Sequence, residues 1–436
     1  MEKKKQIAIV AGGRSSLSGS FYLSRALINS GNNVKYLCFG GGDFIQSQGF
    51  DCYDFAVNFD NETIENSESK TSSFFKRISS KLKKSDTTVF KLLKLIEKYL
   101  DEKQPDLALI DCNLTTFSLP FIKKKIPIIT LNSTMSSFYF EGRLPVFSKH
   151  APSNTFNLLL YLHKKSFWLR IISFQFFNEL FRTFRTIMRL NIPVERVLWV
   201  NIRKHGRKVK RSEYGLRLLA PEIVLSPSGI EYPYPASRVN RLYAGFCVDE
   251  NRVDEDFDFN CMDQNKKLIY CSLGTCSHNY VYAKQFYKSL IEVTHQLNEY
   301  QFVIQEGNSK NLEGDWSIPS NVLIFNRVPQ LELIKRAIIF ITHGGPSSFR
   351  EGVFYTTPMI AFPGWHDQIG DSARIVYYGL GLVGDMKKLS PQLLLSMIRH
   401  IENNIQIKNS LVEMREKIAA QNEVHTCVGF VESFVG

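Results

Sequence analysis

The chain has 436 residues and a formal net charge of +12, from 54 Lys and Arg against 42 Asp and Glu. This length predicts two or three domains, and 44% hydrophobic with 22% charged residues is typical of globular proteins. A disordered or fibrous protein is excluded, and so is a membrane-spanning one, because no run of about 18 apolar residues occurs. The lysines at 3–5 precede an apolar stretch too short for a signal peptide, so a cytoplasmic location is expected.

The N-terminal part predicts a parallel sheet. A strand, a glycine loop, a helix ending near Gly31 and a second strand follow one another within about 40 residues, which is typical of a βαβ unit. A loop or a helix with a solvated face is expected over residues 62–86, which are rich in Ser, Lys and Asn. The predicted strands span residues 6–10, 33–39, 106–111 and 126–131.

Residues 150–220 form a basic helical insertion in which Phe, Leu and Ile alternate with Arg. Residues 164–211 contain 13 Lys or Arg and two acids, a net charge of +11, so the rest of the chain is close to neutral. Three interpretations stay open for this segment: a solvated helical face, an anionic membrane surface as partner, or an acidic acceptor. Nucleic acid is not expected, because no known nucleic-acid-binding module accompanies the charge.

A second α/β pattern follows an acidic, turn-rich stretch. We therefore expect an N-terminal domain over residues 1–235, a linker over 236–262 and a C-terminal domain over 263–436, whose last helix could return to the first domain. Two doubly wound domains facing each other across a cleft are the predicted architecture. The predicted strands span residues 267–273, 302–305, 322–325, 338–342 and 358–362, and the predicted helices 282–297, 331–337 and 347–355.

The segment 326–381 carries the most informative motif. A predicted strand delivers His343 and two glycines to the start of a helix, where unpaired N–H groups and the helix dipole favour a phosphate. Two serines can add hydroxyls to that anion, and Glu351, one turn further, is placed to accept from ribose hydroxyls. Asp367 and Gln368 follow the next strand as a polar pair suited to sugar hydroxyls. This order predicts a nucleotide-sugar site.

These residues resemble the donor-binding signature of the UDP-glycosyltransferase family, most closely its bacterial macrolide and natural-product branch. The resemblance extends to the loop 272–275 and implies the GT-B fold, an α/β fold of two Rossmann-like domains. It implies sugar transfer from a UDP- or dTDP-sugar with inversion and no metal. The implied donor-binding residues are Gly274, Thr275, Arg327, Val328, Gln330, His343, Gly345, Ser347, Ser348, Glu351, Asp367 and Gln368.

The resemblance implies that His343, Ser348 and Thr275 bind phosphate, that Glu351 binds the ribose and that Gln330 lies near the base. The chain departs from the family pattern at three donor positions. Arg327 stands where a Trp often stacks on uracil, and a guanidinium plane can stack there too. Ser347 replaces the usual Asn, and Pro346 stands where plant members carry Trp.

The largest departure is at the catalytic position. The family alignment puts Ser16 where a His normally acts as general base, and Asp111 where a carboxylate orients that His. A serine hydroxyl is no base at neutral pH, so three interpretations stay open: Asp111 is the base, another residue replaces the His, or the activity is altered or lost. The expected catalytic residues are therefore Asp111 and Ser16.

The sequence favours a hexosyltransferase acting on a hydroxyl of an apolar or amphipathic small molecule or lipid. The co-substrate is a UDP- or dTDP-hexose, with no tightly bound cofactor and no metal, since no residue cluster has metal-ligand spacing. A catalytically degenerate nucleotide-sugar-binding protein and a GT-B-fold nucleotide-sugar epimerase are the alternatives. Expected partners are the donor, the acceptor and an anionic membrane surface at residues 164–211, with the protein at the inner membrane face.

Overall fold

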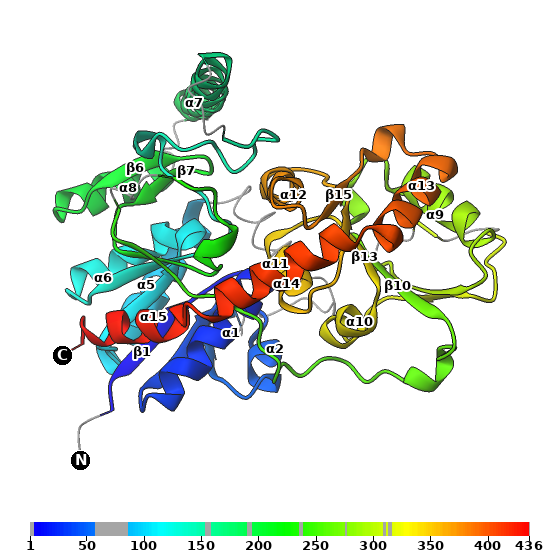
Figure 1. Cartoon of the computed structure of the whole chain (residues 1–436). Helices are drawn as coiled ribbons and strands as arrows, with labels where there is room; N and C mark the ends of the chain where they lie inside the picture. Colours follow the sequence, from blue (N-terminus) through cyan, green and yellow to red (C-terminus); the bar gives the residue numbers. More distant parts are fainter. Residues whose placement is uncertain are drawn as a thin grey trace.

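A computed structural model describes residues 4–56, 86–152, 158–189, 194–234, 239–274, 277–307, 311–312 and 316–435. The loop or helix expected over residues 62–86 falls almost wholly outside these residues, and Thr275 also lies outside them. Two separate parallel sheets, each covered by helices, form two lobes that lie side by side (Figure 1). This confirms the predicted α/β class with two Rossmann-like domains.

The N-terminal sheet is built from strands that alternate with helices, as buried apolar runs bounded by glycine loops predict. Its strands, in spatial order, are β3 (Asp51–Asp54), β2 (Asn33–Cys38), β1 (Gln6–Val10), β4 (Leu107–Asp111), β5 (Ile128–Asn132), β8 (Glu222–Val224) and β9 (Arg241–Tyr243). The helices of this part are α1 (Arg14–Asn29), α2 (Gly42–Ser47), α5 (Asp86–Glu102), α6 (Leu119–Lys123), α7 (Leu158–Arg189) and α8 (Val194–Lys204).

The C-terminal sheet has the strand order of a doubly wound fold, with the switch between β10 and β13. Its strands, in spatial order, are β12 (Val322–Phe325), β11 (Tyr300–Gln305), β10 (Lys267–Ser272), β13 (Ile339–Thr342), β14 (Met359–Ala361) and β15 (Gly381–Val383). The helices are α9 (Ala283–Thr294), α10 (Gln330–Arg336), α11 (Pro346–Phe354), α12 (Asp367–Tyr377), α13 (Pro391–Asn403), α14 (Ile405–Ala419) and α15 (Glu423–Glu432).

The chain passes between the two lobes twice. The first passage follows β9 and leads to β10, and the second leads from α14 to α15 through Asn422, which has a positive φ of 46°. Helix α15 then packs against α1 and β9, so its apolar residues belong to the N-terminal core (Figure 1). The Glu423 carboxylate accepts from the backbone N–H of Ser228 at 3.1 Å, which fixes the start of α15 on the first lobe.

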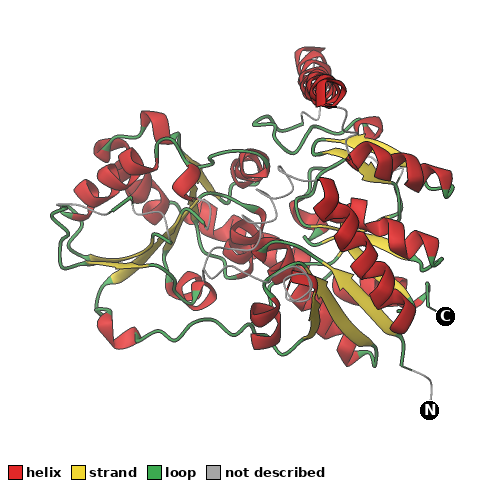
Figure 2. Cartoon of the chain, turned by 180° about the vertical axis from the view of Figure 1, so that it is seen from behind, coloured by secondary structure: helices red, strands yellow, loops and turns green. Residues whose placement is uncertain are grey.

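The basic insertion forms the long helix α7, the shorter α8 and an antiparallel hairpin of β6 (Val209–Ser212) and β7 (Gly215–Leu218). Helix α7 stands at the outer edge of the molecule, beyond this hairpin, in both views (Figures 1 and 2). Among the described residues, no helix combines the length and the hydropathy needed to cross a bilayer.

Helix α12 meets the first lobe in a tight backbone contact. A Cβ atom on Gly370 would lie 1.9 Å from the carbonyl oxygen of Val146, so only a glycine fits there. Val146 belongs to the loop that follows η2 (Tyr139–Glu141) in the first lobe.

We expect Gly370→Ala to destabilise the protein by about 1–3 kcal/mol, because the added methyl group forces helix α12 away from the Val146 loop. Chemical denaturation measures the loss. Gly429→Ala is the matched control, because Gly429 lies in helix α15 with nothing within 4 Å of its added Cβ. Equal stability of the two variants would contradict the tight contact.

Candidate functional site

His343 lies between two glycines at the carboxyl ends of β10 and β13. Ser272 and Thr342, the last residues of these strands, are register partners, so the loops after them meet. A Cβ on Gly274 would lie 2.7 Å from the His343 ring, and one on Gly345 would lie 2.4 Å from it. Burial lowers the pKa of His343 to about 4, so its imidazole is neutral at pH 7, and its Nδ1 atom has no hydrogen-bond partner.

Helix α11 begins at this point with a free N-terminus. Gly345 is its N-cap and Pro346 its first residue, and the first intrahelical bond runs from Phe349 to the Gly345 carbonyl. The N–H groups of Ser347 and Ser348 precede that bond and add to the positive end of the helix dipole. The structure thus brings His343, Gly345, Ser347 and Ser348 together as one anion-binding surface.

Arg350, one turn into α11, reaches from the second lobe to the first. Its guanidinium donates to the carbonyl of Leu225 and, at 3.3 Å, to the hydroxyl of Ser347. A Cβ on Gly19 of α1 would lie 3.2 Å from the same guanidinium. Burial lowers the pKa of Arg350, and its Nε atom has no hydrogen-bond partner. The N-terminal halves of α1 and α11 are therefore in contact.

Glu351 joins the donor motif to the connection between the lobes. One carboxylate oxygen pairs with Arg252 at 3.3 Å, and the other accepts from the Gln330 amide at 2.5 Å. Gln330 in turn accepts from the hydroxyl of Tyr270 at 3.2 Å. Burial raises the pKa of Glu351, while Arg252 acts in the opposite direction. Arg252 was missed by the sequence reasoning, because it stands in an acidic stretch that was interpreted only as a linker.

Two further motif residues flank this group. Val328 is buried beside α10, and Arg327 is exposed and pairs with Glu255 of the interdomain connection at 2.9 Å. The Arg327 guanidinium thus lies at the surface in a half-exposed ion pair with a residue of the connection.

Asp367 and Gln368 begin helix α12, directly after His366, whose φ of 53° is unusual for a residue other than glycine. The amide oxygen of Gln368 accepts from Tyr280 at 3.1 Å and from the backbone N–H of Gly364 at 2.9 Å, which fixes the side chain. Burial raises the pKa of Asp367 to about 6. The pair is therefore held in place at the N-terminus of α12, a helix that the sequence analysis did not predict.

Buried polar atoms without hydrogen-bond partners gather near the starts of α11 and α12. Ser372 belongs to this group, and a Cβ on Gly344 would lie 2.3 Å from its hydroxyl. Such atoms are rare in folded proteins and mark places where a polar ligand or water can bind. Those in this region are His343 Nδ1, Arg350 Nε, Ser372 Oγ and both carboxylate oxygens of Asp371.

Ser16 and Asp111 meet at the carboxyl ends of the N-terminal strands. Ser16 lies in the first turn of α1, and Asp111 is the last residue of β4. The Ser16 side chain is hydrogen-bonded to Asp111, and its hydroxyl also lies 3.0 Å from that of Ser133, a residue the sequence reasoning missed. Burial raises the pKa of Asp111, opposed by the N–H of Asn113, by Ser16 and by the charge of Arg217.

Eight buried ionisable side chains form an alternating chain of bases and acids across the first lobe and into α12, where burial raises the pKa of the last member, Asp371, well above its usual value. We call it the buried ion-pair chain, and each of its side chains is at most 9% exposed. The N···O distances between successive members, in the order in which the next sentence names them, are 2.6, 2.5, 3.1, 3.7, 3.6, 2.6 and 3.8 Å. Its members, in order, are Arg217, Glu222, Arg241, Glu141, Arg143, Glu231, Arg374 and Asp371.

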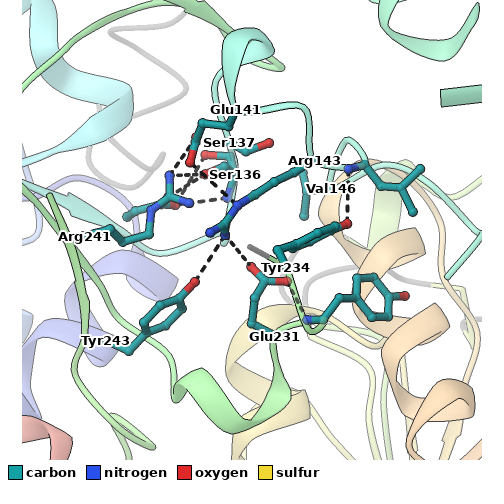
Figure 3. A network of polar contacts seen from close by, with 12 residues as sticks. Ser136, Ser137, Glu141, Arg143, Val146, Glu231, Tyr234, Arg241 and Tyr243 are labelled. Carbon is teal, nitrogen blue, oxygen red and sulfur yellow. Dashed lines mark hydrogen bonds and ion pairs between the residues drawn. The ribbon is translucent and has the colours of Figure 1, made fainter. Parts of the chain in front are cut away.

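The middle of this chain is drawn in Figure 3, where Arg143 lies between Glu231 and the hydroxyl of Tyr243. Burial opposes ionisation of Glu222, but Arg241 and Arg217 outweigh it and lower the pKa of that carboxyl. One end of the chain, Arg217, acts on Asp111, and the other end lies in helix α12 with Asp367 and Gln368. The sequence reasoning missed this arrangement.

Glu213, in the turn of the β6–β7 hairpin, holds the loop that contacts α12. Its carboxylate accepts from the N–H groups of Ser137 at 2.9 Å and Val146 at 3.1 Å, and burial raises its pKa to about 7. The next residue, Tyr214, packs edge-on against Phe147, and Phe147 packs against His366. The hairpin turn therefore lies beside the start of α12.

Comparison with known proteins shows which family the second lobe resembles. Residues 293–433 match the family of "Erythromycin biosynthesis protein CIII-like, C-terminal domain". The resemblance to UDP-glycosyltransferases is confirmed. The chain is 30% identical over 179 residues to an uncharacterized UDP-glucosyltransferase, YojK, of Bacillus subtilis, covering 41% of this chain and 43% of that protein. It is 24% identical over 170 residues to the oleandomycin glycosyltransferase of Streptomyces antibioticus, covering 38% of each.

Solved structures extend the similarity to the whole chain. The glycosyltransferase of kitacinnamycin superimposes with a TM-score of 0.68 at 18% identity and full coverage of both chains. The glycosyltransferase VinC, solved in complex with dTDP, gives 0.64 at 16% identity and 99% coverage of both. The fold is therefore GT-B. The chain spans about half the length of the curated relatives it matches.

Acidification should destabilise the protein through His343. Its folded-state pKa of about 4 lies below its unfolded value, so the unfolded chain binds the proton first and stability falls as pH falls below about 6.5. We expect the wild type to lose about 2 kcal/mol more than His343→Gln between pH 7 and about pH 5. Denaturation at both pH values measures the difference.

The exposed His425→Gln variant is the matched control, because it leaves the buried imidazole in place. A His343→Gln variant with the wild-type pH dependence would show that the imidazole is not the group responsible.

Breaking the buried ion-pair chain should cost far more than breaking a surface pair. We expect Glu231→Gln to lower the free energy of unfolding by about 3 kcal/mol, because Arg143 and Arg374 lose the charge between them. Glu299→Gln, which breaks an exposed pair with Arg399 at 2.6 Å, should cost less than about 1 kcal/mol. Similar losses in the two variants would refute the dependence on burial.

Proposed function

We propose that the protein is a nucleotide-sugar-dependent hexosyltransferase that acts on a hydroxyl of an apolar or amphipathic acceptor. The observation that carries the proposal is the neutral His343 held between two glycines at the start of α11, opposite the Ser16–Asp111 pair on α1 and β4. An anion-binding helix start on one lobe and a buried carboxylate on the other suit a reaction with a diphosphate leaving group and a hydroxyl nucleophile.

The donor is a UDP- or dTDP-hexose. Its diphosphate binds the N–H groups and hydroxyls at the start of α11, with His343 as a neutral donor and Thr275 from the opposite loop. The ribose hydroxyls donate to lone pairs of Glu351 that Arg252 and Gln330 leave available. The sugar hydroxyls bind Asp367 and the amide nitrogen of Gln368.

The base lies beside Val328, with Arg327 over its plane and Gln330 at its edge. The pairing of Arg327 with Glu255 supports this, because it holds the guanidinium in one place next to Val328. VinC in complex with dTDP is the neighbour whose bound nucleotide is consistent with this donor class.

The transfer step uses Asp111 as the base. Asp111 is only 2% exposed, so the proton reaches it through Ser16, whose hydroxyl is already hydrogen-bonded to Asp111. Ser16 Oγ accepts the proton of the acceptor hydroxyl as its own proton passes to Asp111. The acceptor oxygen bonds to the anomeric carbon from the face opposite the diphosphate, which leaves with the bonding electrons, so the configuration inverts. The raised pKa of Asp111 makes it a stronger base than an exposed Asp.

The proposal includes a cytoplasmic, peripheral location. The excess charge of residues 164–211 lies in the first lobe, on the acceptor side, and we propose that this side associates with an anionic membrane surface. A lipid-like or amphipathic acceptor fits such a position.

Asp111→Asn should lower kcat about 10²–10⁴-fold while leaving donor affinity unchanged, because it removes the base and touches no donor contact. Ser16→Ala should lower kcat too, since the proton then has no path to Asp111. Product formation from UDP-glucose or dTDP-glucose with a panel of flat phenolic acceptors measures kcat, and calorimetry measures donor binding.

His425→Gln, which changes an exposed residue of α15 outside the donor motif, is the control for handling and folding. Donor binding without turnover on any acceptor would identify a degenerate binding protein, and an epimerised donor without acceptor would identify an epimerase. Either result would overturn the proposed transfer.

A further inference from the structure

Helix α7 is attached to the first lobe by one face. Lys164 donates to the carbonyl of Gly142 at 2.5 Å, and Trp168 Nε1 donates to the carbonyl of Arg143 at 2.8 Å. Two turns further, the Gln175 amide donates to the carbonyl of Ser212 at 2.9 Å. Positions 164, 168 and 175 are separated by four and seven residues, so they share one side of the helix.

The opposite side of α7 is apolar and exposed. Leu169, Phe176 and Leu180 are separated by seven and four residues and share one stripe, with Phe177 beside it. These four side chains are 54–64% exposed, and Phe174 on the flank is also exposed. A contiguous group of large exposed apolar side chains marks an interaction surface, because isolated exposed side chains are common but clusters are not.

The positive charge around this face indicates which kind of partner it binds. Lys165 and Arg170 lie exposed on the same helix, and α8 adds further exposed cations, within a segment of net charge +11. A second copy of the chain would bring an identical positive surface against this one, which opposes self-association. An anionic bilayer has the opposite charge and takes up apolar side chains between its headgroups.

We infer that the outward face of α7, formed by Leu169, Phe176, Phe177 and Leu180, docks on an anionic membrane surface with the helix parallel to it. The inference deepens the proposed membrane association and does not depend on the transfer step. Helix α7 stands at the outer edge of the molecule in both views (Figures 1 and 2), and these four side chains are among its exposed residues.

The attachment points of α7 link this contact to the site. Gln175 holds the turn of the β6–β7 hairpin through Ser212 and Glu213, and the next residue of that turn, Tyr214, lies against Phe147. Phe147 in turn packs on His366, which precedes the sugar-reading pair. A membrane-docked α7 therefore holds the acceptor side of the site close to the lipid surface.

Co-sedimentation of the full-length protein with vesicles tests the inference. Vesicles of phosphatidylcholine and phosphatidylglycerol in equal parts should bind the wild type at low salt, and vesicles of phosphatidylcholine alone should bind it much less. The triple variant Leu169→Ser, Phe176→Ser, Leu180→Ser should lower the partition coefficient at least about tenfold. Arg170→Gln with Lys165→Gln should lower it about tenfold as well and weaken its salt dependence.

Controls use exposed residues of the same kinds elsewhere. Val281→Ser with Ile405→Ser removes exposed apolar side chains, and Lys408→Gln with Lys417→Gln removes exposed cations on α14; both should bind like the wild type. Circular dichroism of each variant verifies folding, and glucosyl transfer to a soluble phenolic acceptor reports separately on the proposed catalysis.

The outcomes separate the proposals. A wild type that does not bind anionic vesicles overturns the membrane association itself, whereas a triple variant that binds like the wild type overturns only the assignment to α7. Sedimentation velocity tests a second copy of the chain as the partner. If the wild type forms a dimer and the triple variant does not, the face is assigned to a second copy and the inference is overturned. Loss of transfer with intact vesicle binding would instead refute the proposed function alone.

Discussion

The buried ion-pair chain constrains more of this structure than any other interaction. Removing a charge from water costs several kcal/mol, so each interior member is tolerated only with an opposite charge on either side of it. The chain joins β7, β8, β9, η2 and helix α12, which come from both lobes. None of these elements can shift alone without leaving a buried charge unpaired. The charges therefore fix the orientation of α12, and with it Asp367 and Gln368, relative to the sheet that carries Asp111.

Contacts with segments outside the donor motif also hold its residues in place. Glu351 is held by Arg252 from the first passage between the lobes, and Arg350 extends across to Leu225. The residues of the donor motif are thus connected to the first passage and to the first lobe. His343 is the exception, because its position depends on shape: two glycines leave room for the ring, and burial keeps it neutral.

The elements of the sheets could be predicted from the sequence, because a buried parallel strand is a local run of apolar residues bounded by glycine or proline. The strands over residues 6–10 and 322–325 coincide with β1 and β12, and the helix start after His343 was placed within one residue. The proximity of Ser16 to Asp111 followed from the family resemblance. The pairs Arg252–Glu351 and Arg374–Glu231 were not predictable, since their members are separated by 99 and 143 residues. The sequence alone also does not distinguish a charged residue that is buried from one that is exposed to solvent.

The double passage of the chain between the lobes has a mechanical consequence. Two bodies joined by one strand of chain can tilt, twist and slide in any direction around that point. Here the second joint lies at Asn422, where α14 ends and α15 is bound to α1 and β9. Two joints define a line, and rotation about that line is the motion that stretches neither of them. Covalent geometry therefore leaves the lobes one direction of rotation, and the buried Glu231–Arg374 pair at 2.6 Å opposes motion even in that direction.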